Sequence, residues 1–264
     1  MLTKDCYVDD GNNIRDENDN FGLLVSSPIC DAFWDSCDIS IVKNNAEGRP
    51  ELSFDTEKIQ SVYDLLYKLV VENEAAVIND GAVNHINVTF DKGNVLFSMA
   101  QFAHLYTWNE MADDFGILPT PKYDAAQKDY HTMVWYNVSM YSIPVDAKNG
   151  EMSAAVMTSM AYDSNRMVIQ THYEDLLKAR YTRDPESAYM IDLIYKSISL
   201  DFDNVWNESL ATVSGDKSTM PVYIFRSFIT SGNNGVANWW ESNKDALTTL
   251  VNNLVDLHYA NNEA

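Results

Sequence analysis

Segments with helical periodicity alternate along this chain with short apolar segments of strand length. Residues 55–72 form the clearest helix, because Asp55 can cap its start and apolar side chains then recur on one stripe, at Ile59, Val62, Tyr63, Leu66, Leu69 and Val70. An apolar run that begins at Leu23 has the length of a strand. This alternation indicates an α/β fold, and we find no internal repeat or low-complexity linker.

The second half of the chain is predicted to be mainly helical. Residues 150–180 have helical character with a break near Asp163–Asn165. Asp184 and Pro185 form a strong helix start, since aspartate is a good N-cap and proline suits the first helical position. The last helix is expected from Trp239 to about Tyr259, with an apolar side made by Leu247, Leu250, Val251 and Leu254.

The middle of the chain predicts strands. Residues 85–99 favour two strands about a turn at Lys92–Asn94. Residues 103–113 favour a short helix, and residues 115–121 a strand ended by prolines. A further strand is expected over residues 133–144.

Composition excludes several classes of function. The 264 residues suit one large domain or two modest lobes, and the net charge of −21 disfavours binding to nucleic acids and to anionic membranes. No apolar run approaches the length of a membrane span, and the start, MLTKDCYVDD, lacks the apolar region of a signal peptide. Because the three cysteines, Cys6, Cys30 and Cys37, lack CxxC spacing, we expect neither a disulfide framework nor a zinc site, and no cofactor.

The tripeptide Asp114-Phe115-Gly116 raises the question of catalysis, because DFG holds metal in protein kinases. A kinase also needs a glycine-rich loop and an HRD-type loop, and neither motif is present. The sequence also lacks GxSxG, HExxH and Walker A motifs, and its five histidines are scattered. We therefore predict a binding protein and not an enzyme. An acid-dependent hydrolase is an alternative that only the acidic composition favours.

Five segments carry a resemblance to a known family. They lie in order across essentially the whole chain: DGNNIRDENDNFGL (10–23), FDKGNVLFSMAQF (90–102), DDFGILPTPKYDAAQKDY (113–130), YEDLLKARYTRDPESAYMIDLI (173–194) and NWWESNKDALTTLVNNLVD (238–256). Together they resemble the bacterial extracellular solute-binding proteins of carbohydrate-type ABC importers, known as family 1.

The resemblance implies a type II periplasmic-binding-protein fold, in which two α/β lobes joined by hinge strands hold a ligand between them. Residues 1–143 and 186–264 would form the C-terminal lobe, and residues 144–185 a helical remnant of the N-terminal lobe. Family members carry a lipoprotein signal and a first lobe ahead of the segment that starts here at Asp10. We therefore expect most of the N-terminal lobe to be missing from this chain.

The resemblance also implies a site that combines aromatic rings with polar groups, because sugars offer apolar C–H faces and hydroxyls. If residues 133–144 form a strand, Trp135 and Asn137 share one face and Tyr136 points the other way, so we favour Trp135 for the cleft. Core packing is the alternative for each residue. The ligand-binding residues expected are Phe102, Trp108, Trp135, Asn137, Tyr223 and Arg226.

In relatives, the segment that corresponds to the first of these five resembles an EF-hand-like calcium loop. Aligned on Asp19, this sequence places Asp10, Asn12 and Asp16 at three of the ligand positions. Val8 occupies the first ligand position, where an aspartate is expected, and Asn13 replaces the turn glycine. We therefore predict a polar turn here, with calcium as the alternative.

The function implied is the solute-binding component of an ABC importer, which captures a sugar or oligosaccharide and delivers it to the membrane subunits. By the same resemblance, the full-length form is an extracellular, cell-surface lipoprotein. The alternative is a one-lobed relative that acts as an interaction module without binding ligand itself. Its exposed face would then support a homodimer, because large apolar patches seldom remain bare.

Overall fold

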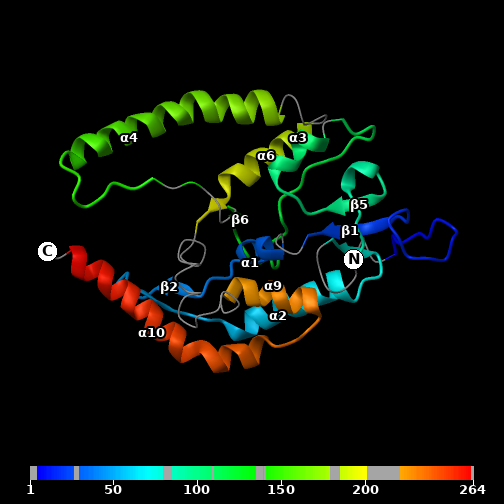
Figure 1. Cartoon of the computed structure of the whole chain (residues 1–264), viewed down its shortest axis with the longest axis horizontal. Helices are drawn as coiled ribbons and strands as arrows, with labels where there is room; N and C mark the ends of the chain where they lie inside the picture. The colour runs from blue at the N-terminus through cyan, green and yellow to red at the C-terminus, as the bar shows by residue number, and fades with distance from the viewer. Residues whose placement is uncertain are drawn as a thin grey trace.

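The structure, a computed structural model, is a mixed α/β arrangement with small, mostly parallel sheets (Figure 1). In the part of the chain that it describes, no helix is both long enough and apolar enough to cross a membrane. The described residues are 5–26, 30–79, 85–108, 110–134, 139, 141–178, 185–200 and 221–262.

The largest sheet among the described residues is parallel and has three strands. Its order is β4-β1-β5, with β1 at Phe21–Val25, β4 at Ala76–Ile78 and β5 at Val95–Ser98. All five residues of β1 are buried, as expected for a parallel strand that has a neighbour on each edge. The strand predicted from Leu23 is therefore confirmed, although it begins two residues earlier.

The chain passes from β1 to β4 through two helical segments and a hairpin, namely α1 (Ala32–Ser36), β2 (Val42–Asn44), β3 (Pro50–Leu52), α2 (Thr56–Leu66) and the π-helical turn η2 (Tyr67–Val71). The carboxylate of Asp55 accepts a hydrogen bond of 2.9 Å from the amide of Lys58, which caps α2 as predicted. The expected apolar stripe of α2 is also confirmed, since Ile59, Val62, Tyr63 and Leu66 are buried.

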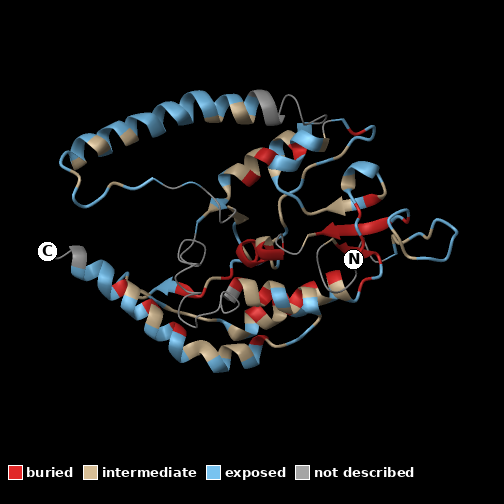
Figure 2. Ribbon diagram, in the orientation of Figure 1, coloured by how far each residue is buried: buried red, intermediate tan, exposed pale blue. Residues whose placement is uncertain are grey.

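The main hydrophobic core lies between α1, α2 and the last two helices, α9 (Pro221–Ser231) and α10 (Val236–Asn262), as the buried residues in Figure 2 show. Trp34 of α1 meets Phe225 of α9 edge to face, with ring centroids 5.5 Å apart. Val251 of α10 belongs to the same cluster. The predicted last helix is confirmed and begins three residues earlier than expected.

The segment between β5 and α9 is less compact. It comprises the short helices η4 (Phe102–His104) and α3 (Leu105–Trp108), then β6 (Thr132–Met133), and later α6 (Pro185–Lys196) and β7 (Ile198–Ser199). Another short helix, η3 (Phe90–Lys92), precedes β5. β6 and β7 pair in parallel. α6 begins at Pro185, as the proline predicted, and buries Ile191 and Ile194 on its inner side.

A helical arm, defined here as Gly150–Lys178, runs along the top of the view in Figure 1. It consists of α4 (Gly150–Ser164), η5 (Asn165–Ile169) and η6 (Thr171–Lys178), of which the last two are π-helical. The predicted helical stretch is thus confirmed as far as Lys178, and residues 179–180 lie outside the described residues. The break expected near Asp163–Asn165 is wrong, because Ser164 and Asn165 keep right-handed helical dihedrals and the helix changes there from α to π without interruption. Neither α4 nor η5 buries a residue, and Figure 2 shows α4 as mostly exposed. The assignment of residues 144–185 to another lobe stays a prediction.

Two strand predictions are wrong. Residues 115–121 form no strand: Pro119 and Pro121 cannot donate ladder hydrogen bonds, and the amide of Ile117 donates instead to Ser187 Oγ at 3.0 Å. Of the two strands expected over residues 85–99, only β5 forms. The backbone of Val88, which the first would contain, is bound by the side chain of Asn79.

Candidate functional site

Three strand ends meet at one edge of the sheet β4-β1-β5. Ser26 follows β1, Asn79 follows β4, and Ser98 ends β5. The strands are parallel, so their carboxyl ends lie together. β4 and β5 also flank β1 on opposite sides, and the crevice outside such an edge is where open α/β sheets bind ligands.

A pocket of about 280 Å³ opens at this edge. Its size lies just below the usual range for pockets that hold drug-sized ligands, and suits a ligand of one ring. Hydroxyl, carboxylate, imidazole and aromatic groups all contribute to the lining, which comprises Leu24, Ser26, Asn79, Val88, Thr89, Phe90, Asp91, Ser98, Met99, Ala100, His104, Thr107 and Trp108.

An aromatic cluster forms one side of the pocket. The ring of Trp108, at the end of α3, lies 4.7 Å from the ring of Phe90 and 5.4 Å from the imidazole of His104, centroid to centroid. Phe115 supports this pair from behind and meets both Phe90 and Trp108 edge to face. Two rings that line the pocket are therefore held in fixed positions by a third, which does not line it.

Hydrogen bonds fix some polar groups of the pocket and leave others available. The amide of Asn79 bonds the backbone of Val88 through both its nitrogen and its oxygen, at 2.8 and 3.3 Å. Thr107 Oγ1 donates to the carbonyl of His104 at 2.8 Å. Within the described residues, no hydrogen bond or ion pair engages the side chains of Thr89 and Asp91, which are both exposed.

The predicted site residues fall into four groups, of which the last, Tyr223 and Arg226, lies apart on α9. Trp108 lines the pocket, as a ligand-binding residue would. Phe102 lies nearby on η4 but packs on Leu105 and Ile191, beneath α3. Trp135 and Asn137 lie outside the described residues.

Tyr223 and Arg226 form a separate arrangement on α9 and do not line the pocket. The guanidinium of Arg226 donates two hydrogen bonds to the carboxylate of Asp31, one of them 2.9 Å from Nε, and lies 4.6 Å from the ring centroid of Tyr223. Burial raises the pKa of Asp31 to about 6, although Arg226 acts to lower it. This buried ion pair ties α9 to α1, and the binding role predicted for both residues stays a prediction.

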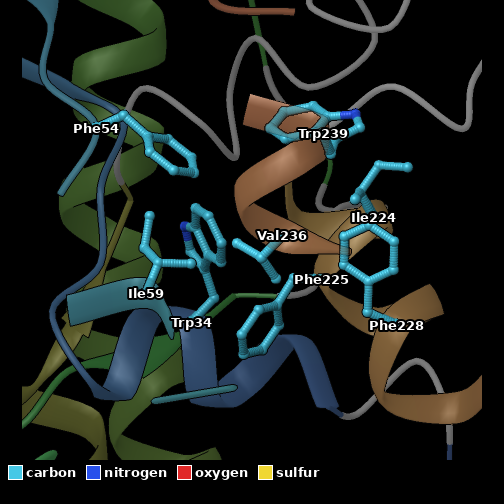
Figure 3. Close-up of a pocket in the computed structure, with 8 residues that line it drawn as sticks. All are labelled: Trp34, Phe54, Ile59, Ile224, Phe225, Phe228, Val236 and Trp239. Carbon is cyan, nitrogen blue, oxygen red and sulfur yellow. The ribbon is translucent and has the colours of Figure 1, made fainter. Parts of the chain in front are cut away.

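A second hollow, shown in Figure 3, is apolar and very small. It leaves about 10 Å³ of free space, which is barely enough for one water molecule. Its walls come from α1, α2, α9, α10 and the residues before α2, and consist of Trp34, Phe54, Ile59, Ile224, Phe225, Phe228, Val236 and Trp239. This hollow is a gap in core packing and not a binding site.

The segment with the EF-hand-like pattern forms a compact polar turn. Asp19 is fully buried, and its carboxylate accepts hydrogen bonds from Tyr7 Oη at 2.9 Å and from the amides of Asp10 and Asp16 at 2.9 and 3.1 Å. Burial raises the pKa of Asp19, but these hydrogen bonds outweigh it, so the pKa lies below its ordinary value. Asn12 Nδ2 also donates to Asp16, at 3.2 Å.

The group that could hold a cation differs from the one expected. Asp9, Asp10 and Asp19 each place a carboxylate oxygen within 4.8 Å of the others. Val8 occupies the first ligand position and forms a backbone bridge with Asn20 instead. Asp9, the next residue, supplies a carboxylate beside this position. Its Oδ1 accepts a hydrogen bond from the amide of Asn13, which adopts a positive φ of 60°.

The DFG tripeptide contributes structure at the edge of the site. Asp113 and Asp114 are exposed, and Phe115 packs on the pocket aromatics. The carboxylate of Asp113 lies against Gly93, where a Cβ would fall 2.7 Å from Asp113 Oδ2, a contact that this exposed side chain can relieve by moving aside. Gly93 also has a φ of +76°, which glycine adopts without strain.

Sequence reasoning missed most of the pocket lining. His104 is one of five scattered histidines, and no motif in the sequence marks Ser26, Asn79 or Asp91 as site residues. The positions of Ser26 and Ser98 at strand ends could have revealed them, because ligands collect at the carboxyl edge of parallel strands. No family model matches the chain, and neither the curated proteins nor the solved structures include a match.

Proposed function

We propose that this chain is a solute-binding protein that holds a single sugar ring in the pocket at the carboxyl edge of β4-β1-β5. The observation that carries the proposal is the pocket itself, which combines the rings of Trp108 and Phe90 with the hydroxyls of Ser26, Thr89 and Ser98. Aromatic rings bind the C–H faces of sugars, and hydroxyls exchange hydrogen bonds with sugar hydroxyl groups.

The strand order supports a more specific assignment. A sheet whose first strand is flanked by the next two parallel strands, with a pocket at its carboxyl edge, is what one lobe of a type II periplasmic binding protein requires. We therefore propose this fold, with residues 1–143 and 186–264 in one lobe. The partners would be the membrane subunits of an ABC importer, and the full-length protein a cell-surface lipoprotein.

The test is sugar binding by the wild type and by Trp108→Ala, measured by isothermal titration calorimetry against a panel of monosaccharides. Loss of the stacking ring is expected to weaken binding at least about tenfold. Tyr189→Ala is the matched control, because Tyr189 is a 64% exposed aromatic on α6 and does not line the pocket. Circular dichroism checks that both variants fold. The proposal fails if no monosaccharide binds, or if Trp108→Ala binds like the wild type.

A second function is favoured by the arm. Apolar side chains that are more than half exposed recur along α4 and η5, at Met152, Val156, Met160, Tyr162, Met167 and Val168. A surface of this kind suits contact with another protein, so the alternative is an interaction module that forms a homodimer. Light scattering after size exclusion separates the two: a dimer that Met160→Asp converts to a monomer favours the module.

A further inference from the structure

The charge that the described lining residues bring to the pocket is negative. Asp91 is the only carboxylate, lysine or arginine among the lining residues, and the one other titratable side chain there is His104. Asp113 adds a second carboxylate close by, because it lies against Gly93, two residues beyond Asp91. Lys92, between Asp91 and Gly93, is exposed and does not line the pocket.

The rest of the pocket also suits a cation. The faces of aromatic rings attract ammonium groups, and Trp108 and Phe90 supply two rings beside Asp91. The carboxylate of Asp91 makes no hydrogen bond or ion pair with another described residue, so it is available to a ligand. The net charge of −21 adds a long-range field that attracts cations and repels anions.

We infer that the pocket selects a protonated amino sugar over the neutral sugar of the same shape and excludes the corresponding anionic sugar. This inference rests on the proposed sugar-binding function. The ammonium group would pair with Asp91 and contact the aromatic cluster, while the ring hydroxyls meet Thr89 and the serines at the ends of β1 and β5. An amino sugar satisfies both features of the pocket, whereas a neutral sugar leaves the carboxylate without a charged partner.

Three probes of nearly equal shape test the inference: glucosamine, glucose and glucuronate, titrated calorimetrically into the whole chain at neutral pH. We expect glucosamine to bind about tenfold more tightly than glucose, because its ammonium group adds a charge attraction to Asp91 and a cation–π contact with the aromatic rings, and a hydroxyl supplies neither. Glucuronate is expected not to bind measurably. Added salt should weaken the binding of glucosamine more than that of glucose.

Asp91→Asn isolates the charge, because asparagine keeps the shape of the side chain. The ratio of glucosamine to glucose affinity is expected to fall about fivefold in this variant, because the charge attraction is lost and the cation–π contact remains. Asp146→Asn removes an exposed carboxylate away from the pocket and should leave the ratio at its wild-type value.

The outcomes separate the inference from the proposed function. If glucose binds as tightly as glucosamine, or if Asp91→Asn keeps the wild-type ratio, the charge selection is overturned and sugar binding stands. If none of these sugars and no member of the wider panel binds, the sugar-binding function fails and the inference falls with it.

Discussion

The helical arm (Gly150–Lys178) and the rest of the described chain, called the body here, both contain regular helices. These helices are stabilised in different ways. In the body, α2 has a capped start and buries four side chains in its Thr56–Leu66 span. In the arm, α4 is longer and buries none. The helix of the arm therefore depends on the intrinsic preferences of its alanine, methionine and glutamate residues, whereas that of the body depends on packing.

The contact between arm and body is local. His172 and Tyr173 of η6 meet Tyr106 of α3 and Tyr195 of α6, with the rings of Tyr173 and Tyr195 4.2 Å apart. α4 and η5 extend beyond this contact with exposed apolar side chains. The free energy of unfolding should therefore depend mainly on side chains of the body, and changes in α4 should alter it little.

The largest effect is expected from removing the ring at the centre of the body. Trp34 is 1% exposed and packs edge to face on Phe225, so Trp34→Ala should lower the free energy of unfolding by about 3–5 kcal/mol. Tyr162→Ala, in the arm, is the matched aromatic control and should change it by less than about 0.5 kcal/mol. Urea denaturation measures both. Equal losses would contradict the comparison.

Breaking the ion pair between Arg226 and Asp31 should lower the free energy of unfolding by about as much as Trp34→Ala does, or slightly less. Arg226→Met leaves the carboxylate of Asp31 buried without its partner, which typically destabilises a protein by about 3–5 kcal/mol. The double variant Asp31→Asn/Arg226→Met should recover much of this loss, because no buried charge remains. If the double variant is as unstable as Arg226→Met, an unpaired charge is not the cause.

The sequence predicts well those features whose residues lie close together along the chain. The helix at residues 56–66 was predictable because Asp55 and the apolar stripe lie within one segment. The ion pair between Arg226 and Asp31 was not, because its partners are 195 residues apart and no local pattern links them. The contact through which Arg226 ties α9 to α1 is therefore visible only in the structure, and its predicted binding role stays a prediction.

The pocket was only partly predictable for the same reason. Trp108 was selected through a family resemblance, and the structure places it in the lining. Trp108 contacts Phe90, which precedes β5, and Phe115, which follows α3. These contacts form only when the folded chain brings the three segments together. The strand expected over residues 115–121 failed because alternation alone does not supply a neighbouring strand.

A pH dependence of stability should also come from the body. The pKa of Asp31 is raised to about 6 from 3.8, so the folded chain holds this proton more tightly than the unfolded chain. The contribution of Asp31 is therefore complete below about pH 4 and is lost as the pH rises through about 6, by at most about 3 kcal/mol. Urea denaturation of the wild type and Asp31→Asn across this window measures it. Parallel pH profiles would contradict the prediction.

The smallest effect is expected in the arm. Met160 is 65% exposed on α4, and alanine favours helix at least as strongly as methionine, so Met160→Ala should change the free energy of unfolding by less than about 0.5 kcal/mol. Urea denaturation at two protein concentrations measures it. A loss above about 1 kcal/mol would show that Met160 is buried in solution. If that loss grew with protein concentration, a second copy of the chain would be covering α4. The arm would then be exposed only in the monomer.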